Sequence, residues 1–263
     1  MDRDRRIAWS FLGRVGYRPG VELQESIRDR LRRGEGLEHL LLLEHPPVYT
    51  LGRSARRSDI VAIPEWLAAR GVEVVECDRG GQVTYHGPGQ LVGYPVIDLS
   101  PDRRDVRRYV RDLRAVLVRT LADFDVEARG EGDPDRIGVW VGQAKIASIG
   151  VHLSRWITTH GFALNVSTEL GYFDGIVPCG LAGVRMTSIE RITGARPALV
   201  EVGERLARHF ADVFERPLER RAPDEVWAEL AGAPQDDPPR SIASGAEGPP
   251  AGWRDAHDQG ADR

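Results

Sequence analysis

Lysine is almost absent from this chain of 263 residues. It occurs once, at Lys145, among 36 basic residues, so every other one is arginine. Cysteine is nearly as scarce, with Cys77 and Cys179 alone, and two cysteines do not make the disulfide framework of a small secreted domain. No apolar run approaches the ~20 residues that a membrane-spanning helix needs. The chain is therefore expected to be reduced, with no role in a membrane.

Other absences exclude whole classes of function. The net charge of -4 leaves no basic excess for bulk nucleic-acid binding. The seven histidines show no metal-ligand spacing, and the sequence has no HExxH or CxxC motif, so neither a metal nor another cofactor is expected. A P-loop and a Gly-x-Ser-x-Gly nucleophile elbow are also missing. The N-terminus is charged and lacks the apolar core of a secretion signal, which favours a cytoplasmic protein.

The composition changes sharply near the C-terminus. Hydrophobic residues make up 41% and charged residues 29% of the chain, as in ordinary soluble proteins. Residues 232–263 are instead rich in Pro, Gly, Ser, Ala and Asp and cannot bury a core. We expect one folded domain over residues 1–231 and a disordered tail over 232–263.

The apolar pattern predicts helices and strands that do not alternate strictly. Helical periodicity covers residues 21–33, 65–70, 105–124, 197–214 and 224–230. Strand-like runs cover residues 7–12, 39–44, 48–51, 72–77, 94–99, 138–141, 144–152 and 156–166. Gly142-Gln143 is a two-residue hairpin signal that places Lys145 near the start of a strand. This order favours an α/β (α+β) fold with a mixed central sheet flanked by helices.

Residues 79–93 form a glycine-dense stretch that the pattern assigns to a loop. Its five glycines do not fit the dinucleotide-binding spacing, but they let a backbone approach a ligand closely. A plain hairpin loop with tight turns accounts for the same glycines equally well. Arg79, Tyr85 and His86 lie in this stretch and favour a ligand-lining role, although a lone turn histidine is more often structural.

Lys145 and Cys179 are the candidate chemical groups. A lysine can give up and take back a proton when its environment tunes it, which arginine cannot do. Cys179 stands between Pro178 and Gly180, outside any core run, where a thiolate could act as a nucleophile. Each alone has an ordinary alternative, a surface lysine or a small buried hydrophobe. Together they form a base and nucleophile if the fold brings them into contact.

Four blocks of the chain resemble one family. They are HPPVYTLGRS (45–54), RGGQVTYHGPGQLVGYPVIDL (79–99), GVWVGQAKIASIGVHLSRWITTHGFALNV (138–166) and IVPCG (176–180). In this order they are similar to the lipoyl(octanoyl) transferases of lipoate biosynthesis, over about residues 7 to 215. The resemblance implies the catalytic-domain fold shared with biotin and lipoate protein ligases.

The resemblance also implies an activity, partners and site residues. The enzyme is expected to move octanoyl from octanoyl-acyl carrier protein to a lysine ε-amine on lipoyl domains, those of 2-oxoacid dehydrogenase E2 subunits and of glycine cleavage H protein. The family's acyl-thioester cysteine falls on Cys179, and the lysine that lowers its pKa falls on Lys145. Its substrate-lining segments fall on Arg79, Gly80, Gly81, Gln82, Val83, Thr84, Tyr85 and His86, on Ser148, Ile149 and Gly150, and on Gly161, Phe162 and Ala163.

Two other functions compete with this assignment. A lipoate or biotin protein ligase on the same fold would activate a free acid with ATP and would need no nucleophilic cysteine. A non-catalytic carrier-protein-binding module would make Lys145 and Cys179 incidental. The Cys179 loop and the absence of any other lysine favour the transferase.

The single lysine generates the first prediction. We expect Lys145→Arg to keep the fold and the charge but to lose most turnover, since a guanidinium cannot cycle its proton at neutral pH. Steady-state octanoyl transfer and thermal unfolding, measured on both proteins, check this. Near-normal turnover in the variant would remove lysine from the mechanism.

Overall fold

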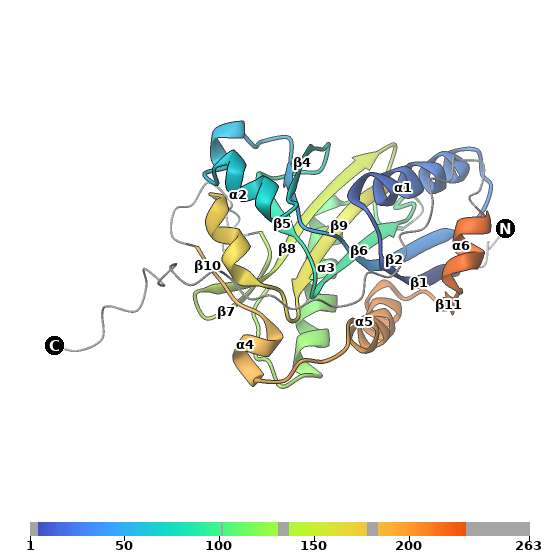
Figure 1. Ribbon diagram of the computed structural model, residues 1–263. Coiled ribbons are helices and arrows are strands. Elements are labelled where there is room, and N and C mark those ends of the chain that lie inside the picture. Colours follow the sequence, from blue (N-terminus) through green and yellow to red (C-terminus); the bar gives the residue numbers. More distant parts are fainter. Residues whose placement is uncertain (1–4, 101, 131–136, 178–183, 230–263) are drawn as a thin grey trace.

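The computed structural model describes residues 5–100, 102–130, 137–177 and 184–229, and these form two sheets (Figure 1). The larger has eight described strands in the order β10-β8-β9-β6-β2-β1-β11, with β7 paired to β8. The smaller has the order β4-β3-β5. Strands β1 and β2 are parallel, whereas β2, β6, β9 and β8 are successively antiparallel. The prediction of a mixed sheet flanked by helices is confirmed. Residues 232–263, the predicted tail, lie outside the described residues.

Most strands match the predicted runs. The strands are β1 (Ile7–Arg14), β2 (Glu38–Glu44), β3 (Val48–Leu51), β4 (Glu73–Glu76), β5 (Val83–His86), β6 (Gln90–Val96), β7 (Val139–Val141), β8 (Ala144–Ser154), β9 (Ile157–Asn165), β10 (Arg185–Met186) and β11 (Leu218–Arg220). The helices are α1 (Tyr17–Arg32), α2 (Pro64–Ala69), α3 (Val106–Ala122), α4 (Ile189–Thr193), α5 (Leu199–Phe214) and α6 (Pro223–Glu229), with short 3-10 turns η1 (Arg57–Asp59) and η2 (Leu170–Gly175).

Strand β2 shows why one run of the sequence is continuously apolar. Leu40 and Leu42 pack into the core formed with α3 and α5, whereas Leu41 and Leu43 pack on the opposite face with residues of α1. A strand covered on both faces needs apolar side chains at every position. In Figure 1, α1 and α6 lie on one side of the large sheet and α3 and α5 on the other.

Local chemistry sets where the helices begin. The Asp105 carboxylate accepts hydrogen bonds from the backbone N–H groups of Arg107 and Arg108, so α3 begins where an N-cap aspartate predicts. Helix α1 instead starts four residues earlier than the apolar pattern indicates, at Tyr17. Its first turn packs closely against His45: a Cβ at Gly20 would lie 3.2 Å from the His45 ring.

The loop predicted over residues 79–93 is wrong in part. Residues 83–86 are strand β5, and β6 begins at Gln90 rather than at residue 94. Gly93 lies inside β6. This position has to be glycine, because the Phe162 ring lies 2.1 Å from where a Cβ would be. Gly81, with φ +89°, and Gly89, with φ +79°, have the positive φ that a tight turn or bend needs. Cross-strand packing, which a local pattern does not contain, keeps this glycine-rich segment in the sheets.

An aromatic cluster joins the small sheet to η2. Tyr85 stacks on Tyr172 with centroids 4.7 Å apart, and Phe173 meets Tyr85 edge-on. The Tyr49 hydroxyl donates to the Tyr172 carbonyl. These contacts fix the chain as it approaches residues 178–183.

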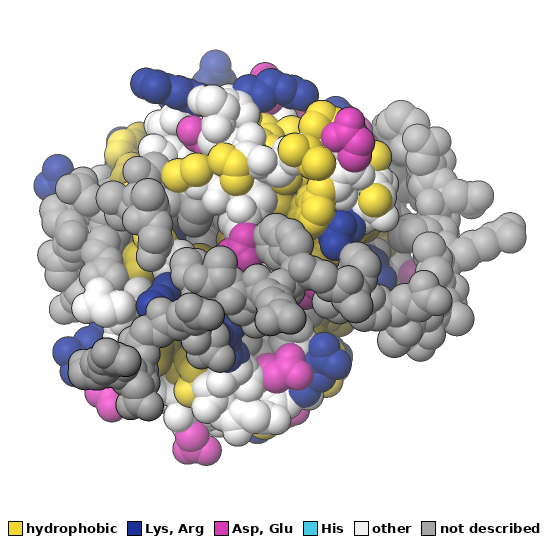
Figure 2. All heavy atoms as spheres, turned by 60° about the vertical axis from the view of Figure 1, so that its left-hand side comes forward, with side chains coloured by type: hydrophobic (Ala, Val, Ile, Leu, Met, Phe, Trp, Pro, Cys, Tyr) yellow, Lys and Arg dark blue, Asp and Glu magenta, His cyan; other side chains and the backbone are white. Residues whose placement is uncertain are grey.

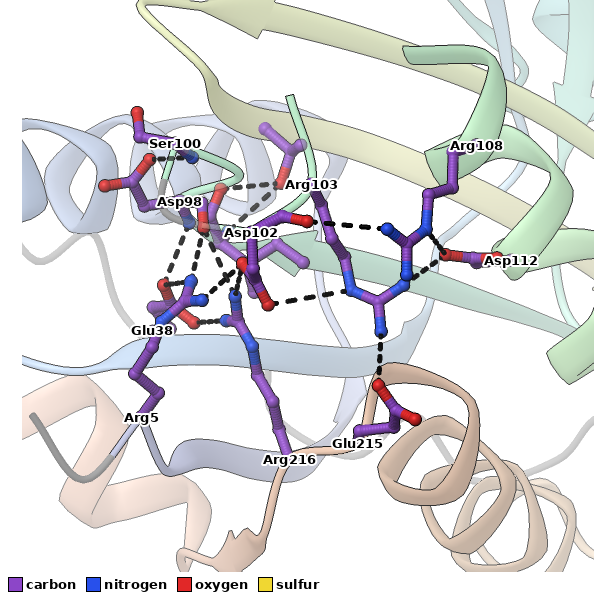
Figure 3. Close-up of polar contacts among 12 residues, drawn as sticks. Arg5, Glu38, Asp98, Ser100, Asp102, Arg103, Arg108, Asp112, Glu215 and Arg216 are labelled. Atoms are coloured by element: carbon purple, nitrogen blue, oxygen red, sulfur yellow. Dashed lines mark hydrogen bonds and ion pairs between the residues drawn. The ribbon is translucent and has the colours of Figure 1, made fainter. Parts of the chain in front are cut away.

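A buried ion-pair network ties the N-terminal segment to β2, α3 and α5 (Figure 3). The Glu38 carboxylate lies between Arg5 and Arg216 and also accepts the backbone N–H of Asp98 at 3.0 Å. Arg216 is 3% exposed at its side chain and Glu38 12%, so the pair is largely removed from water. None of the helices in the described part of the chain has the length and apolar character to cross a bilayer.

We expect Glu38→Ala to lower the free energy of unfolding by about 3 kcal/mol, because the buried Arg216 then has only the more exposed Asp102 as an ion-pair partner. Glu219→Ala is the control, since Glu219 pairs with Arg6 and Arg221 on the surface, where such pairs contribute at most about 1 kcal/mol. Chemical denaturation of both variants measures the difference. Equal losses would contradict the role given to Glu38.

Candidate active site

A cavity of about 720 Å³ lies between the segment that leads into β5 and strands β8 and β9. This is the size of pocket that holds small ligands. The two sheets thus bring together all three segments predicted from the resemblance, although they lie far apart in the sequence. The predicted residues on its walls are Arg79, Gly80, Gly81, Gln82, Val83, Thr84, His86, Ser148, Ile149, Gly150, Gly161, Phe162 and Ala163, together with Lys145.

Tyr85 is the predicted substrate-lining residue that does not line this cavity. Side chains alternate along a strand, so β5 directs Thr84 and His86 away from the face that carries Tyr85. Tyr85 packs in the aromatic cluster instead.

Several lining residues were not predicted. Tyr17, Tyr94 and His160 contribute polar groups, and the apolar lining includes Val106, Val110, Ile137, Val151, Phe173 and Met186. One signal was available for His160. Strand β9 is buried along its whole length, yet it carries Thr158, Thr159 and His160 in succession. Three buried polar residues in a row are unusual in a core strand and indicate a site.

Glycines allow the two walls to touch. The Gly80 N–H donates to the Val151 carbonyl at 2.9 Å, which joins the small-sheet segment to the edge of β8. A Cβ at Gly150 would lie 2.8 Å from the Gly80 carbonyl oxygen, closer than real Cβ contacts. Gly52 is equally constrained, since its Cβ would meet the Gly81 carbonyl at 2.4 Å. Contact between backbone segments therefore requires glycine at positions 52 and 150, a reason that neither alternative for the glycine-dense stretch had included.

Arg79 places a buried positive charge at the cavity. Its side chain donates to the Thr50 carbonyl at 2.7 Å and to the Thr50 hydroxyl at 2.8 Å, and the residue is 7% exposed. No carboxylate of the described residues forms an ion pair with it. Neutral acceptors therefore orient the guanidinium without neutralising it, which suits it to an anion or to a developing oxyanion.

His86 ends a chain of hydrogen bonds whose directions can be derived. The Thr187 carbonyl can only accept, so Asn165 presents its NH₂ there at 3.0 Å and its oxygen to Gln90. Gln90 must then donate to both Asn165 and the Tyr85 carbonyl, which turns its oxygen toward His86 Nδ1 at 2.8 Å. His86 Nδ1 is thus the donor. Burial holds the pKa of His86 well below its ordinary value, so the ring is neutral and Nε2 is an acceptor.

His45 and Tyr94 form a second fixed pair beside it. His45 Nδ1 donates to the Val15 carbonyl at 2.7 Å, and Nε2 accepts from the Tyr94 hydroxyl at 2.7 Å. Burial lowers the pKa of His45 to about 4, so this arrangement persists at neutral pH. Tyr17 packs its ring against both His45 and His86.

Lys145 lies in the cavity wall and is 3% exposed. Its position near the start of the second hairpin strand, predicted from Gly142-Gln143, is confirmed by the β7–β8 pairing. Its ammonium lies 5.6 Å from the centroid of the Trp140 ring. A Cβ at Gly138 would meet Lys145 Cε at 2.5 Å, so a glycine leaves room for the lysine side chain.

Cys179 lies outside the described residues, but both flanks of residues 178–183 are held. Before this segment, the Val177 N–H donates to the Asp59 carbonyl at 2.7 Å. After it, β10 pairs in parallel with β8, and Met186 is aligned with Lys145. The Thr187 N–H then donates to the Lys145 carbonyl at 2.9 Å. The chain that leaves residue 183 therefore runs directly beside Lys145.

The fold agrees with comparison to known proteins. Residues 17–211 match the family model of the lipoyl protein ligase A/B catalytic domain. The chain belongs to this family. It is 52% identical to an octanoyltransferase of Solibacter usitatus over 204 residues, 78% of this chain and 91% of that one. An octanoyltransferase of Acidobacterium capsulatum is 47% identical over 84% of this chain and 95% of its own length. These relatives show that the chain is an acyltransferase.

Solved structures support the fold independently. A crystal structure of lipoate-protein ligase A bound with ATP superimposes with a TM-score of 0.65 at 15% identity, covering 87% of this chain and 94% of the other. A bipartite lipoate protein ligase of Thermoplasma acidophilum gives a TM-score of 0.64 at 16% identity, covering 86% of this chain and 91% of the other. The predicted ligase-like fold is thus confirmed.

The glycine contact at the cavity can be tested directly. We expect Gly150→Ala to reduce acyl transfer by about 10²-fold, because its Cβ would push the Gly80 wall away and misplace the ligand. Gly171→Ala is the control, since nothing lies within 4 Å of its Cβ. Activity and thermal unfolding are measured on both. A fully active Gly150→Ala variant would show that the wall spacing is unimportant.

Proposed function

We propose that this acyltransferase moves octanoyl from octanoyl-acyl carrier protein to the ε-amine of a lysine on lipoyl domains, through a thioester on Cys179. The observation that carries the proposal is the placement of Lys145. The chain's only lysine lies buried in the cavity wall, on the strand that pairs with β10 just after the Cys179 segment. E2 subunits and the glycine cleavage H protein are the acceptors that fit this reaction.

In the first half-reaction, Lys145 takes the Cys179 proton and the thiolate attacks the donor thioester. A new Sγ–C bond forms, the bond to the phosphopantetheine sulfur breaks, and Lys145 returns the proton to that leaving sulfur. A free thiol with a pKa of ~8.5 is mostly protonated at neutral pH, so a partner that accepts its proton raises the nucleophile concentration. Thioester exchange is nearly balanced in free energy and needs neither ATP nor a metal.

In the second half-reaction, the acceptor amine attacks the acyl-enzyme and an amide replaces the thioester. Each tetrahedral intermediate carries an oxyanion, and the buried Arg79 guanidinium is the cation of the cavity walls that suits it. The apolar lining by Val106, Val110, Ile137 and Val151 suits the acyl chain. Each buried CH₂ contributes about 0.8 kcal/mol, which is enough to select among chain lengths.

An intact-mass measurement tests the proposal. Incubation with octanoyl-acyl carrier protein, without ATP, is expected to add one octanoyl group to the wild-type chain. Cys179→Ser should abolish the adduct, whereas Cys77→Ser, the matched control, should retain it. No adduct in the wild type without ATP would favour an ATP-dependent ligase. Carrier-protein binding without any transfer would favour a non-catalytic module.

A basic surface near the small sheet suits an acidic protein partner. Arg53, Arg56 and Arg57 are exposed beside η1, and Val61 and Ile63 are exposed next to them at 56% and 61%. Figure 2 shows basic side chains along the top of this face, above a group of hydrophobic ones. The partners expected for this family, acyl carrier proteins and lipoyl domains, are typically acidic around their attachment sites.

We expect Arg53, Arg56 and Arg57 changed together to Glu to raise KM for octanoyl-acyl carrier protein about tenfold or more, since charge complementarity governs encounter. Transfer from a small octanoyl thioester should be unaffected. The charge-matched control changes Arg191, Arg196 and Arg208, which are exposed on α4, the following loop and α5. Equal losses with both donors would contradict docking at this surface.

A further inference from the structure

Asp78 and His160 form a hydrogen-bonded pair at the cavity that the proposed reaction does not use. His160 Nε2 lies 2.7 Å from Asp78 Oδ1. The His160 side chain is 4% exposed and lines the cavity, whereas the Asp78 side chain is 51% exposed. The pair therefore joins the interior of the cavity to solvent. The two residues are 82 positions apart in the sequence.

The His160 backbone adopts a conformation that few residues other than glycine accept. Its φ is +56° in the middle of β9, between residues that pair with β8 in regular register. A second element stabilises this conformation. Gln24 of α1 donates to the Gly20 carbonyl at 2.9 Å, which leaves its side-chain oxygen to accept the His160 N–H at 2.6 Å. Supported strain of this kind is found at functional sites.

The hydrogen bond to Asp78 also determines which His160 nitrogen is available. The hydrogen bond from His160, the largest cause, lowers the pKa of Asp78 to about 2, so Asp78 is an ionised acceptor. Nε2 is then the donor, so Nδ1 is the nitrogen that can accept a proton. No described residue forms a hydrogen bond with Nδ1, and this atom is not sealed within the protein. A carboxylate that fixes one nitrogen while the other is open is the arrangement of a general base.

The chemistry of amide formation needs such a group. A lysine amine is protonated at neutral pH, and two protons leave its nitrogen as the ammonium becomes an amide. One ends on the Cys179 sulfur, by way of Lys145, when the thioester bond breaks. The other must reach solvent, and Lys145 cannot carry both at once. This argument rests on the proposed function.

We propose that His160 is the general base that takes the first proton from the acceptor ammonium before the amine attacks the acyl-enzyme. Nδ1 accepts the proton, Asp78 holds the ring and stabilises the imidazolium, and the proton then passes to water at the exposed side of the pair. The freed amine attacks the thioester carbon. The titratable and charged groups that surround His160 are Asp78, His152, Tyr94, His86 and Arg79.

The test separates the two half-reactions and uses two acceptors. His160→Asn is the main variant, because asparagine tolerates a positive φ. Asp78→Asn is the second, since its exposed side chain can change without unfolding the protein. His152→Gln is the matched control, because His152 Nε2 also approaches Asp78, at 3.5 Å, but does not line the cavity. The acyl-enzyme is formed first and then mixed with a lipoyl domain or with hydroxylamine, which is uncharged at neutral pH.

We expect His160→Asn to form the acyl-enzyme at the wild-type rate but to transfer octanoyl to the lipoyl domain about 10²-fold more slowly. Transfer to hydroxylamine, after subtraction of the uncatalysed rate, should fall by less than about threefold, since no proton must first be removed. Asp78→Asn should show a smaller loss of the same kind, and His152→Gln none. The wild-type rate of transfer to the lipoyl domain should show a pH dependence that the His160→Asn variant lacks. The deficit of the variant should shrink as the pH rises, because more of the acceptor ammonium then loses its proton to solvent without a base.

Equal losses with both acceptors, or a pH profile that His160→Asn leaves unchanged, would overturn the proposal and make His160 structural. A failure of the wild type to form an acyl-enzyme would instead overturn the proposed function. In that case the two acceptors are compared at steady state, and the same difference between lysine and hydroxylamine still decides whether His160 is the base.

Discussion

The hydrogen bond from the Gly80 N–H to the Val151 carbonyl, 2.9 Å long, joins the two sheets at the cavity. Backbone can approach backbone so closely only where no Cβ intervenes, which explains the glycines at positions 80 and 150. The contact sets the distance between the wall that carries Arg79 and the strand that carries Lys145. This one spacing sets how far apart the Arg79 and Lys145 walls of the cavity lie.

Around that contact, buried polar groups are held by acceptors that cannot change role. Carbonyl oxygens fix Asn165, Gln90 and, through them, His86. The Thr50 carbonyl and hydroxyl orient Arg79 in the same way. A buried polar network is stable only when all its members are satisfied, so each ring tautomer here is determined by the backbone. The cavity therefore keeps its pattern of donors and acceptors when no ligand is bound.

Much of the fold could be predicted because its signals are local. The β2 leucines, the Asp105 cap and the Gly142-Gln143 hairpin each lie within a few residues of the feature that they determine. The glycine-dense segment was predicted less well. Whether Gly93 sits in a loop or a strand depends on the Phe162 ring, which belongs to a strand far along the chain. The local pattern of apolar residues carries no information about such a long-range contact.

The sequence by itself determined which chemical groups are available: one lysine, a cysteine between Pro178 and Gly180, and a set of glycines whose order resembles a single family. Only the tertiary structure decided which of those residues share a cavity, and it moved Tyr85 to an aromatic core while adding Tyr17, Tyr94 and His160. The pairing of His160 with Asp78 depends on a positive φ that α1 supports through Gln24. His160 can pair with Asp78 only when α1, β9 and the segment after β4 are packed together. These segments lie far apart in the sequence, so no local pattern predicts the contact.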